Sequence, residues 1–279
     1  MNDIKNKILK NVKLDNCLIG FYANNLKGIE IAYNENLAFE SASCIKVFIL
    51  VEYYRQIHEG IKNKNDILEY TSNMYTKGSG IFQHLDIGVE MSSKNLVYMM
   101  IIASDNIAVN ILINYLGIEN INNTIRSLGF KVTKLLNKID FSKYTTMGIT
   151  TPKEYYEIFR KIYYKELFSE NISNEILEVL KKQQEKEMLL NELNFVDSLP
   201  NENPIKYIAS KSGGFNSVKL FNIRDMSKNV RNDGGIISTI YGDYIICIFI
   251  TNFDTRNNGI KYGGIISKNV YDFFKNLGQ

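Results

Sequence analysis

The stretch Ser43-Cys44-Ile45-Lys46 decides the fold of this chain, because the sequence pattern changes there from strand to helix. Before it, apolar runs at 18–23 and 28–33 are separated by Asn24-Asn25 and predict a β-hairpin. After it, apolar residues recur at helical spacing until about Gly60. We therefore expect the stretch to lie at the N-terminus of a helix.

Ser43 and Lys46 would share one face of this helix, because positions i and i+3 lie about 5–6 Å apart at Cβ. A serine hydroxyl becomes a good nucleophile only when a base removes its proton, and a neutral lysine amine can do this. Free lysine is charged at pH 7, but burial and a neighbouring cation both lower its pKa. The same spacing arises by chance, so the pair needs support from elsewhere in the chain.

A second polar motif, Ser104-Asp105-Asn106, interrupts two apolar helical runs. We expect Ser104 to relay a proton to a leaving nitrogen and Asn106 to offer its amide to a substrate carbonyl and to Lys46. Asp105 is expected to brace the turn. The alternative is a simple helix cap, because Ser, Asp and Asn are the preferred capping residues. The two roles are compatible.

A third motif, Lys211-Ser212-Gly213-Gly214, lies at the end of a predicted strand. Lys211 is expected to hold an anionic group of a substrate, and the Ser212 hydroxyl to bind a substrate carboxylate. Glycines allow backbone to approach a ligand closely. The N–H of Gly214 would then complete an oxyanion hole with the N–H of Ser43. The alternative is a strand that ends in a glycine turn.

Composition argues against several other kinds of site. The net charge is only +3 and the lysines are scattered, which is not typical of nucleic-acid binding. The only histidines are His58 and His84, which leaves little room for a Ser-His-Asp triad. Two of the three cysteines, Cys17, Cys44 and Cys247, could form a disulfide, and the sequence leaves open whether they do. The absence of a His/Cys cluster predicts no metal site. We expect no cofactor.

The N-terminal residues 4–12 alternate apolar side chains with lysines, which predicts an amphipathic helix. They lack the continuous apolar run of a signal peptide, and no apolar segment of about 18 residues predicts a membrane span. We therefore expect a cytoplasmic protein, or a secreted or cell-envelope protein if an export signal has been removed. The oligomeric state stays open.

The rest of the chain divides into a helical block, which includes a long helix expected at 172–188, and a strand-rich C-terminal part that ends in a helix. Three strands are predicted in that part: 207–211, 235–240 and 244–250. Because strands at both ends of the chain must pair, we expect an α+β fold with the helical block inserted into an antiparallel sheet. The expected division is an α/β subdomain, 1–42 plus 205–279, and a helical subdomain, 43–204.

The three motifs, in this order, resemble the SxxK, SDN and KTG motifs of the class A β-lactamase and penicillin-binding protein family. The resemblance extends to 78–85, which is similar to the rim of the family's site, to 103–129 and to 234–237. It covers nearly the whole chain. It implies a five-stranded antiparallel sheet with flanking N- and C-terminal helices, packed on an all-helical subdomain, with the site between them.

The resemblance also implies a function. It is that of a serine hydrolase that forms an acyl-enzyme on Ser43 with a small-molecule substrate, with hydrolysis of a β-lactam, and hence antibiotic resistance, as the first expectation. The alternatives are an esterase or D-Ala-D-Ala peptidase-like hydrolase, and a sensor or trap that is acylated once. The implied catalytic residues are Ser43, Lys46, Ser104 and Lys211, and the implied substrate-binding residues are Asn106, Ser212, Gly213 and Gly214.

The sequence departs from the family in three places, the mildest of which is Ser212, where many members have threonine with the same hydroxyl. The stretch 135–146, which corresponds to the family's omega loop, contains no glutamate to activate the deacylating water. Asp140 is its only carboxylate, either as a substitute base or as a brace for the loop. In addition, Gly234 stands where the family has a carboxylate-binding arginine. Arg231 and Arg224 are candidate replacements, and the alternative is a solvated basic loop.

Overall fold

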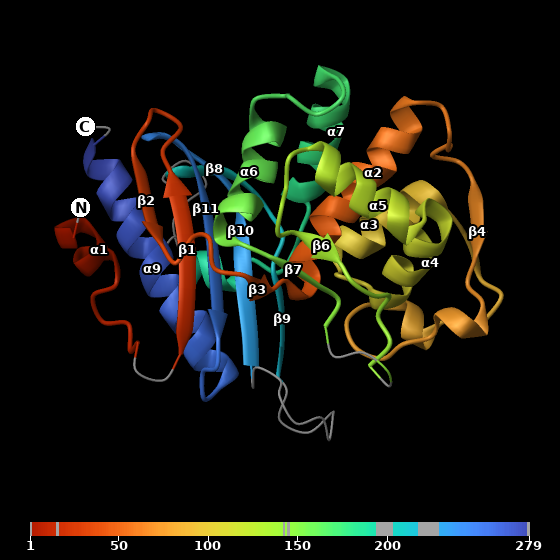
Figure 1. Ribbon diagram of the computed structural model, residues 1–279, viewed down its shortest axis with the longest axis horizontal. Coiled ribbons are helices and arrows are strands. Elements are labelled where there is room, and N and C mark those ends of the chain that lie inside the picture. The colour runs from red at the N-terminus through yellow and green to blue at the C-terminus, as the bar shows by residue number, and fades with distance from the viewer. Residues whose placement is uncertain are drawn as a thin grey trace.

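One antiparallel sheet is built from both ends of the chain (Figure 1). The computed structural model describes residues 2–14, 17–141, 143, 146–193, 203–216 and 229–277. The strand order is β2-β1-β11-β10-β8, and β9 pairs with β10 beyond the end of β8. The strands are β1 Leu18–Asn24, β2 Glu30–Tyr33, β8 Ile205–Ser210, β9 Gly213–Asn216, β10 Asn229–Thr239 and β11 Gly242–Thr251. The expected five-stranded antiparallel sheet is confirmed, with its edge broken into β8 and β9.

The central strand β11 joins the two ends of the chain. It pairs with β1 from Leu18↔Thr251 to Asn24↔Ile245, and with β10 on its other side. Residues 244–250 are all buried, which is the pattern of a strand that is covered on both faces. Helices α1 (Asn2–Ile8) and α9 (Arg256–Leu277) cover one face, and α6 (Pro152–Tyr163) covers the other (Figure 1).

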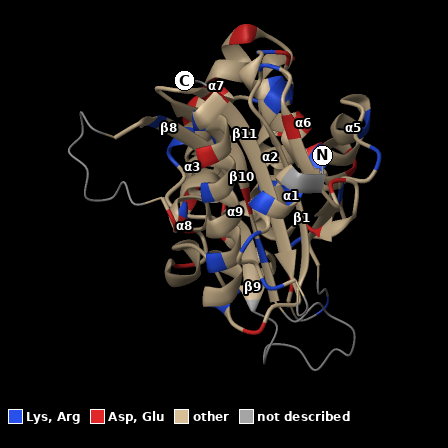
Figure 2. Cartoon of the chain, turned by 90° about the vertical axis from the view of Figure 1, so that its left-hand side faces the viewer, with Lys and Arg blue, Asp and Glu red and all other residues tan. Residues whose placement is uncertain are grey.

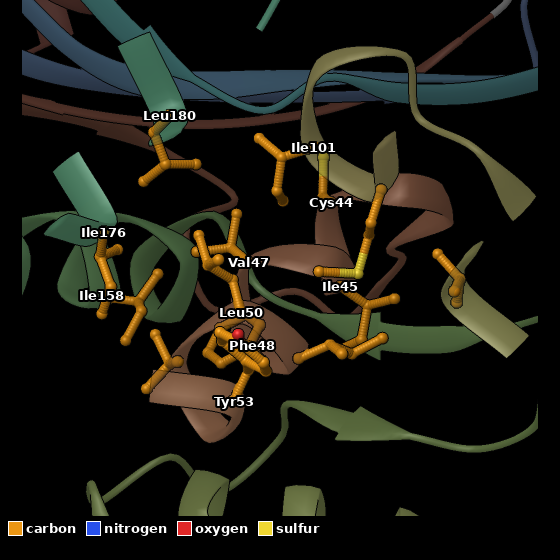
Figure 3. Close-up of a cluster of buried hydrophobic side chains, with 14 of the residues drawn as sticks. Cys44, Ile45, Val47, Phe48, Leu50, Tyr53, Ile101, Ile158, Ile176 and Leu180 are labelled. Carbon is orange, nitrogen blue, oxygen red and sulfur yellow. The ribbon is translucent and has the colours of Figure 1, made fainter. Parts of the chain in front are cut away.

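The helical block is organised around a core helix that follows the SxxK stretch. Residues 47–51 of this helix, α2, are no more than 1% exposed, so it is buried nearly all round. Figure 3 shows Val47 and Phe48 among side chains from the neighbouring helices, including Ile101, Ile158 and Leu180. The helices of the block are α2 Lys46–His58, α3 Ser93–Ile102, α4 Asn106–Leu116, α5 Ile118–Ser127 and α7 Glu170–Lys181.

Several short elements that the sequence pattern does not predict complete the fold. A small sheet has the order β3-β7-β6, and a two-stranded ladder joins β4 to β5. Strands of two or three residues are too short to show a periodic pattern. These elements are β3 Phe39–Glu40, β4 Ile67–Glu69, β5 Glu90–Ser92, β6 Lys134–Leu135, β7 Gly148–Thr150, and the 3₁₀ turns η1 Ala42–Ile45, η2 Ser72–Met74 and η3 Phe82–His84.

The prediction of one long helix at 172–188 is wrong. Helix α7 ends at Lys181, residues 182–186 are not helical, and a short helix α8 spans Glu187–Leu190. The charged run at 181–187 has no apolar side chain to bury, so packing does not continue the helix there. Its Gln183 is instead buried against the C-terminal strands.

The strand expected at 235–240 starts earlier, because β10 begins at Asn229 and its first residues pair with β9. We keep the division into 1–42 plus 205–279 and 43–204 as a proposal. Helices of the inserted segment, among them α6, α7 and α8, lie against the sheet itself.

Charged residues of both signs are interspersed over the helices and loops on the side of the molecule that Figure 2 shows, with no continuous stripe of either sign. Within the described residues, no helix combines the length and apolar character needed to cross a membrane. The same residues contain no group of three or more His, Cys, Asp or Glu side chains that could hold a metal. All three cysteines are free thiols.

Candidate active site

Ser43 lies in the turn η1, between the small sheet and α2. The preceding residue Ala42 has a left-handed backbone with φ of 45°, which turns the chain so that Ser43 is only half-buried at the floor of a cavity. The strand β9 passes close by. A Cβ atom placed on Gly213 would lie 2.5 Å from the backbone nitrogen of Ser43, so only glycine fits there. The hydroxyl of Ser43 has no hydrogen-bond partner among the described residues.

Lys46 is fully buried, and its amino group contacts the second motif. Nζ donates to the carbonyl oxygen of Ser104 at 2.6 Å, and lies 3.1 Å from both Ser104 Oγ and Asn106 Oδ1. Burial, with the charge of Lys211 as a second cause, holds the pKa of Lys46 well below its ordinary value. The amine is therefore closer to the neutral form that a general base requires.

The second motif is a strained and tightly braced turn. Ser104 has a positive φ of 54°, which is unusual for a residue with a side chain. Asp105 caps α4 by accepting from Ile107 N and Ala108 N, both at 2.9 Å, and its other oxygen accepts from the backbone at 81–82. The capping and positioning roles are thus combined, because the cap on α4 also fixes the Ser104 and Asn106 side chains beside Lys46.

Lys211 lies in the break between β8 and β9, and it is also fully buried. Its backbone N–H donates to Gly234 at 3.1 Å, and its carbonyl accepts from the hydroxyl of Tyr155 at 2.7 Å. Its Nζ donates to the carbonyl of Ser212 at 2.8 Å. Burial lowers the pKa of Lys211. Two buried lysines from opposite ends of the chain therefore approach one site.

Gln183 and Glu185 lie at the site, although nothing in the sequence pattern predicts them there. The Ser212 hydroxyl accepts from Gln183 Nε2 at 2.9 Å and donates to Glu185 Oε2 at 3.2 Å. Both partners lie in the segment that links α7 to α8. The sequence carries no signal for these two residues, because their segment has the composition of an exposed helix. In addition, Ser212 lies 29 residues from Gln183 and 27 residues from Glu185 in the chain.

Arg231 lies beside the third motif, on the part of β10 that pairs with β9. Its guanidinium donates to the carbonyl of Val230 at 2.7 Å and covers Gly214, where an added Cβ would lie 2.4 Å from Nη1. Burial lowers the pKa of Arg231 to about 10, and the charge of Arg256 acts in the same direction. Arg224, the other candidate for binding a carboxylate, lies outside the described residues.

Two cavities meet at Ser43. One, of about 300 Å³, is lined by apolar side chains, among them Ile139, Phe141, Met147 and Phe215, and also by polar ones such as Asn106. The other, of about 200 Å³, is polar and is lined by Ser104, Ser212, Gly213 and Arg231, among others. Neither histidine lines them. An elongated substrate could therefore place its carbonyl at Ser43, an apolar group on one side and a polar group on the other.

Asp140 lines the larger cavity and lies 3.4 Å from Lys143 in an ion pair. The half-buried Glu40 at the end of β3 lines the same cavity. Sequence reasoning missed Glu40 because it precedes Ser43 in the chain, far from the stretch that corresponds to the omega loop. The structure therefore brings two carboxylates, not one, to the cavity at Ser43.

A model of the family described as the beta-lactamase enzyme family matches residues 3–274. No curated protein matches the chain. The family match therefore covers nearly the whole chain, including all three motifs.

Solved structures of this kind share the fold. A beta-lactamase from Sphaerobacter thermophilus superposes with a TM-score of 0.83 at 23% identity, over 98% of this chain and 97% of that one. The protein PBP-A superposes with a TM-score of 0.85 at 21% identity, over 99% of this chain and 97% of that one. A representative of class A beta-lactamase from Bacteroides cellulosilyticus superposes with a TM-score of 0.79 at 21% identity, over 98% of this chain and 99% of that one.

Proposed function

The chain belongs to the beta-lactamase enzyme family, and from that membership we propose that it is a serine hydrolase that works through an acyl-enzyme on Ser43. The observation that carries the proposal is the environment of Lys46. This amine is fully buried, has a lowered pKa and lies one helical turn after Ser43. A base of this kind is what a serine nucleophile needs in cavities that no histidine lines.

In the proposed first half-reaction, the neutral amine of Lys46 removes the proton of Ser43, and Oγ attacks the substrate carbonyl carbon. The backbone N–H groups of Ser43 and Gly214 stabilise the oxyanion that forms. The bond between the carbonyl carbon and the leaving nitrogen then breaks. The proton passes from Lys46 to Ser104 Oγ, whose own proton goes to that nitrogen. The acyl group stays on Ser43.

The buried amino group of Lys211 is proposed to act in the same acylation step. We propose that Lys211 stabilises Ser104 while it transfers its proton, and attracts an anionic group of the substrate. Asn106, which lies beside Lys46, is proposed to hold the substrate amide. Gly213 lets β9 lie close enough to Ser43 for its neighbour Gly214 to reach the oxyanion.

In the second half-reaction, water must attack the acyl-enzyme, and a base must accept its proton. Asp140 and Glu40 are the proposed candidates, because both line the cavity that contains Ser43. Asp140→Asn and Glu40→Gln would separate them, since loss of the true base leaves acylation intact and stops release.

We propose a β-lactam as the substrate. The absence of a glutamate from 135–146 favours a second candidate, a hydrolase of esters or D-Ala-D-Ala peptides. Such an enzyme would use the same first half-reaction with a different second one. Without a working base in the cavity, the protein would be a sensor or trap that is acylated once.

A substrate panel tests the proposed function. We expect wild type and Ser127→Ala, a change on the exposed end of α5, to hydrolyse a chromogenic cephalosporin, and Ser43→Ala to be inactive. Turnover of p-nitrophenyl esters or D-Ala-D-Ala peptides without turnover of the cephalosporin would favour the second candidate. Failure of every substrate to react at Ser43 would contradict a serine hydrolase.

A further inference from the structure

Gln183 is a buried polar side chain that the proposed reaction steps do not use. It lies two residues after the end of α7 and is only 2% exposed. Its Nε2 donates to Ser212 Oγ at 2.9 Å, whereas its Oε1 is buried without a hydrogen-bond partner among the described residues. A buried acceptor that stays unpaired destabilises the folded state. The bond to Ser212 is therefore the contact that accounts for a glutamine at this position.

This bond fixes the direction of the Ser212 hydroxyl. An amide nitrogen can only donate, so the bond from Gln183 uses a lone pair of Ser212 Oγ. A serine hydroxyl has a single proton, which must then point to another acceptor. In the structure that acceptor is Glu185 Oε2 at 3.2 Å. Ser212 and Glu185 both line the polar cavity, so the proton points into it.

The Glu185 carboxylate occupies a place that a substrate carboxylate can take. Glu185 is exposed, and its 3.2 Å contact is long for a hydroxyl that donates to a carboxylate, so it can turn to water. Positive charge beside Ser212 favours an anion in its place. Lys211 Nζ lies 2.8 Å from the Ser212 carbonyl oxygen, and Arg231 lines the same cavity.

Gln183 is held in position by the segment that contains it. The backbone N–H of the next residue, Gln184, donates to the carbonyl of Ile102 at 3.4 Å, close to the second motif. On the other side, the Leu189 carbonyl of α8 accepts a hydrogen bond from α9 at 2.8 Å. The amide that contacts the third motif is therefore anchored both to the helical block and to the C-terminal helix.

We propose that Gln183 is a positioning residue that keeps Ser212 as a hydrogen-bond donor toward the cavity, so that Ser212 recognises a carboxylate on the leaving group of the acyl donor. The leaving group is placed there because Ser104, which is proposed to protonate it, lines the same cavity. This inference rests on the proposed function. It predicts that Gln183 affects the recognition of a carboxylate, whereas a purely structural residue would affect all donors alike.

Two thioesters that share one benzoylglycyl group provide the test. Their leaving thiols are mercaptoacetate, which is anionic, and mercaptoacetamide, which is neutral and of similar size. Thiol release in the first turnover gives the KM and the rate constant of Ser43 acylation for each donor. For wild type we expect kcat/KM for the anionic donor to exceed that for the neutral donor by about tenfold.

Gln183→Met removes the amide and keeps the length of the side chain. We expect it to lower the tenfold preference to about threefold, mainly by raising the KM of the anionic donor. Ser212→Ala should bring the two donors to within about twofold of each other. Adding Gln183→Met to Ser212→Ala should not change the preference further, because the two residues act through one hydroxyl. Gln184→Met, the same change at the exposed neighbour, is the control and should keep the wild-type preference.

Circular dichroism identifies the variants that fold, and Gln183→Leu replaces Gln183→Met if the methionine variant does not. Equal losses for both donors in the Gln183 variant, or a preference that it leaves at the wild-type value, would overturn the inference. A wild-type protein that reacts equally with both donors would overturn it as well. If neither donor acylates Ser43 in wild type, the proposed function itself fails and the inference fails with it.

Discussion

At the scale of single residues, the site depends on a lysine that burial keeps close to neutral. Lys46→Ala should lower the rate of Ser43 acylation by roughly 10²–10⁴-fold, which is the usual contribution of a general base. The change also leaves the Ser104 carbonyl without its close donor, at a cost of about 1–3 kcal/mol in unfolding free energy. Acylation rates of wild type and variant with the same donor provide the measurement. Lys94→Ala, an exposed lysine of α3, is the control, and near-normal acylation by Lys46→Ala would exclude Lys46 as the base.

A second residue makes stability depend on pH. Asp233 is fully buried beneath the third motif, its Oδ2 has no partner among the described residues, and burial raises its pKa to about 7. An unfolded aspartate has a pKa near 3.9, so between about pH 4 and 7 the native state holds more protons than the unfolded state. The free energy of unfolding contributed by this group therefore falls as pH rises through that window.

Asp233→Asn removes this titration and keeps the oxygen that accepts from Gly234 N at 2.9 Å. We expect the variant to gain stability relative to wild type as pH increases from 5 to 8, by about 2–4 kcal/mol. Thermal unfolding of both proteins across this range measures the difference. A difference in Tm that stays constant with pH would contradict the assignment.

At the scale of elements, the close approach of β9 to the turn η1 forms the floor of the site. Gly213→Ala would place a methyl group 2.5 Å from Ser43 N, so β9 must move and Gly214 with it. We expect acylation to fall by about 10²–10³-fold, as for loss of an oxyanion donor. The comparison is Gly28→Ala, at a φ of 96° in open space, which should reduce stability by about 1–2 kcal/mol with normal acylation. Normal acylation by Gly213→Ala would contradict the proposed role of β9.

The elements that carry the motifs could be predicted from the sequence, because each has a local signal. The helix after Ser43 has an apolar period, the turn at Ser104 separates two apolar runs, and the strand before Lys211 ends in glycines. The pairing of strands from both ends of the chain in one sheet also follows, since the helical block between them offers no other long strands. These signals placed the lysines and serines of the candidate site in one fold.

The contacts that lie outside the motifs could not be predicted in the same way. The segment with Gln183 and Glu185 has the charge pattern of a surface helix, and only the packing of α8 on α9 brings it to Ser212. Glu40 precedes Ser43 on a strand of two residues that has no visible period. Such contacts depend on tertiary packing, which local propensity does not encode.

At the scale of the whole molecule, the sheet requires both ends of the chain. The pairing of β1 with β11 joins residues 18–24 to 245–251, and β8 and β10 complete the same sheet. A fragment that ends at residue 204 would expose β1 and the apolar face of α6. We expect it to unfold without a cooperative transition, whereas the full chain unfolds cooperatively, as followed by circular dichroism. A sharp transition in the fragment would show that the inserted segment folds independently.

If the proposed function is right, this fold presents Ser43 as a nucleophile that becomes acylated. Intact mass spectrometry at successive times after mixing with benzylpenicillin tests it most directly. We expect a mass increase of one penicillin per chain, located at Ser43 by peptide mapping and absent from Ser43→Ala. Decay of the adduct within seconds would indicate turnover, and persistence for hours would indicate a trap. An unmodified protein at all times, or an adduct on another residue, would show that Ser43 is not the nucleophile.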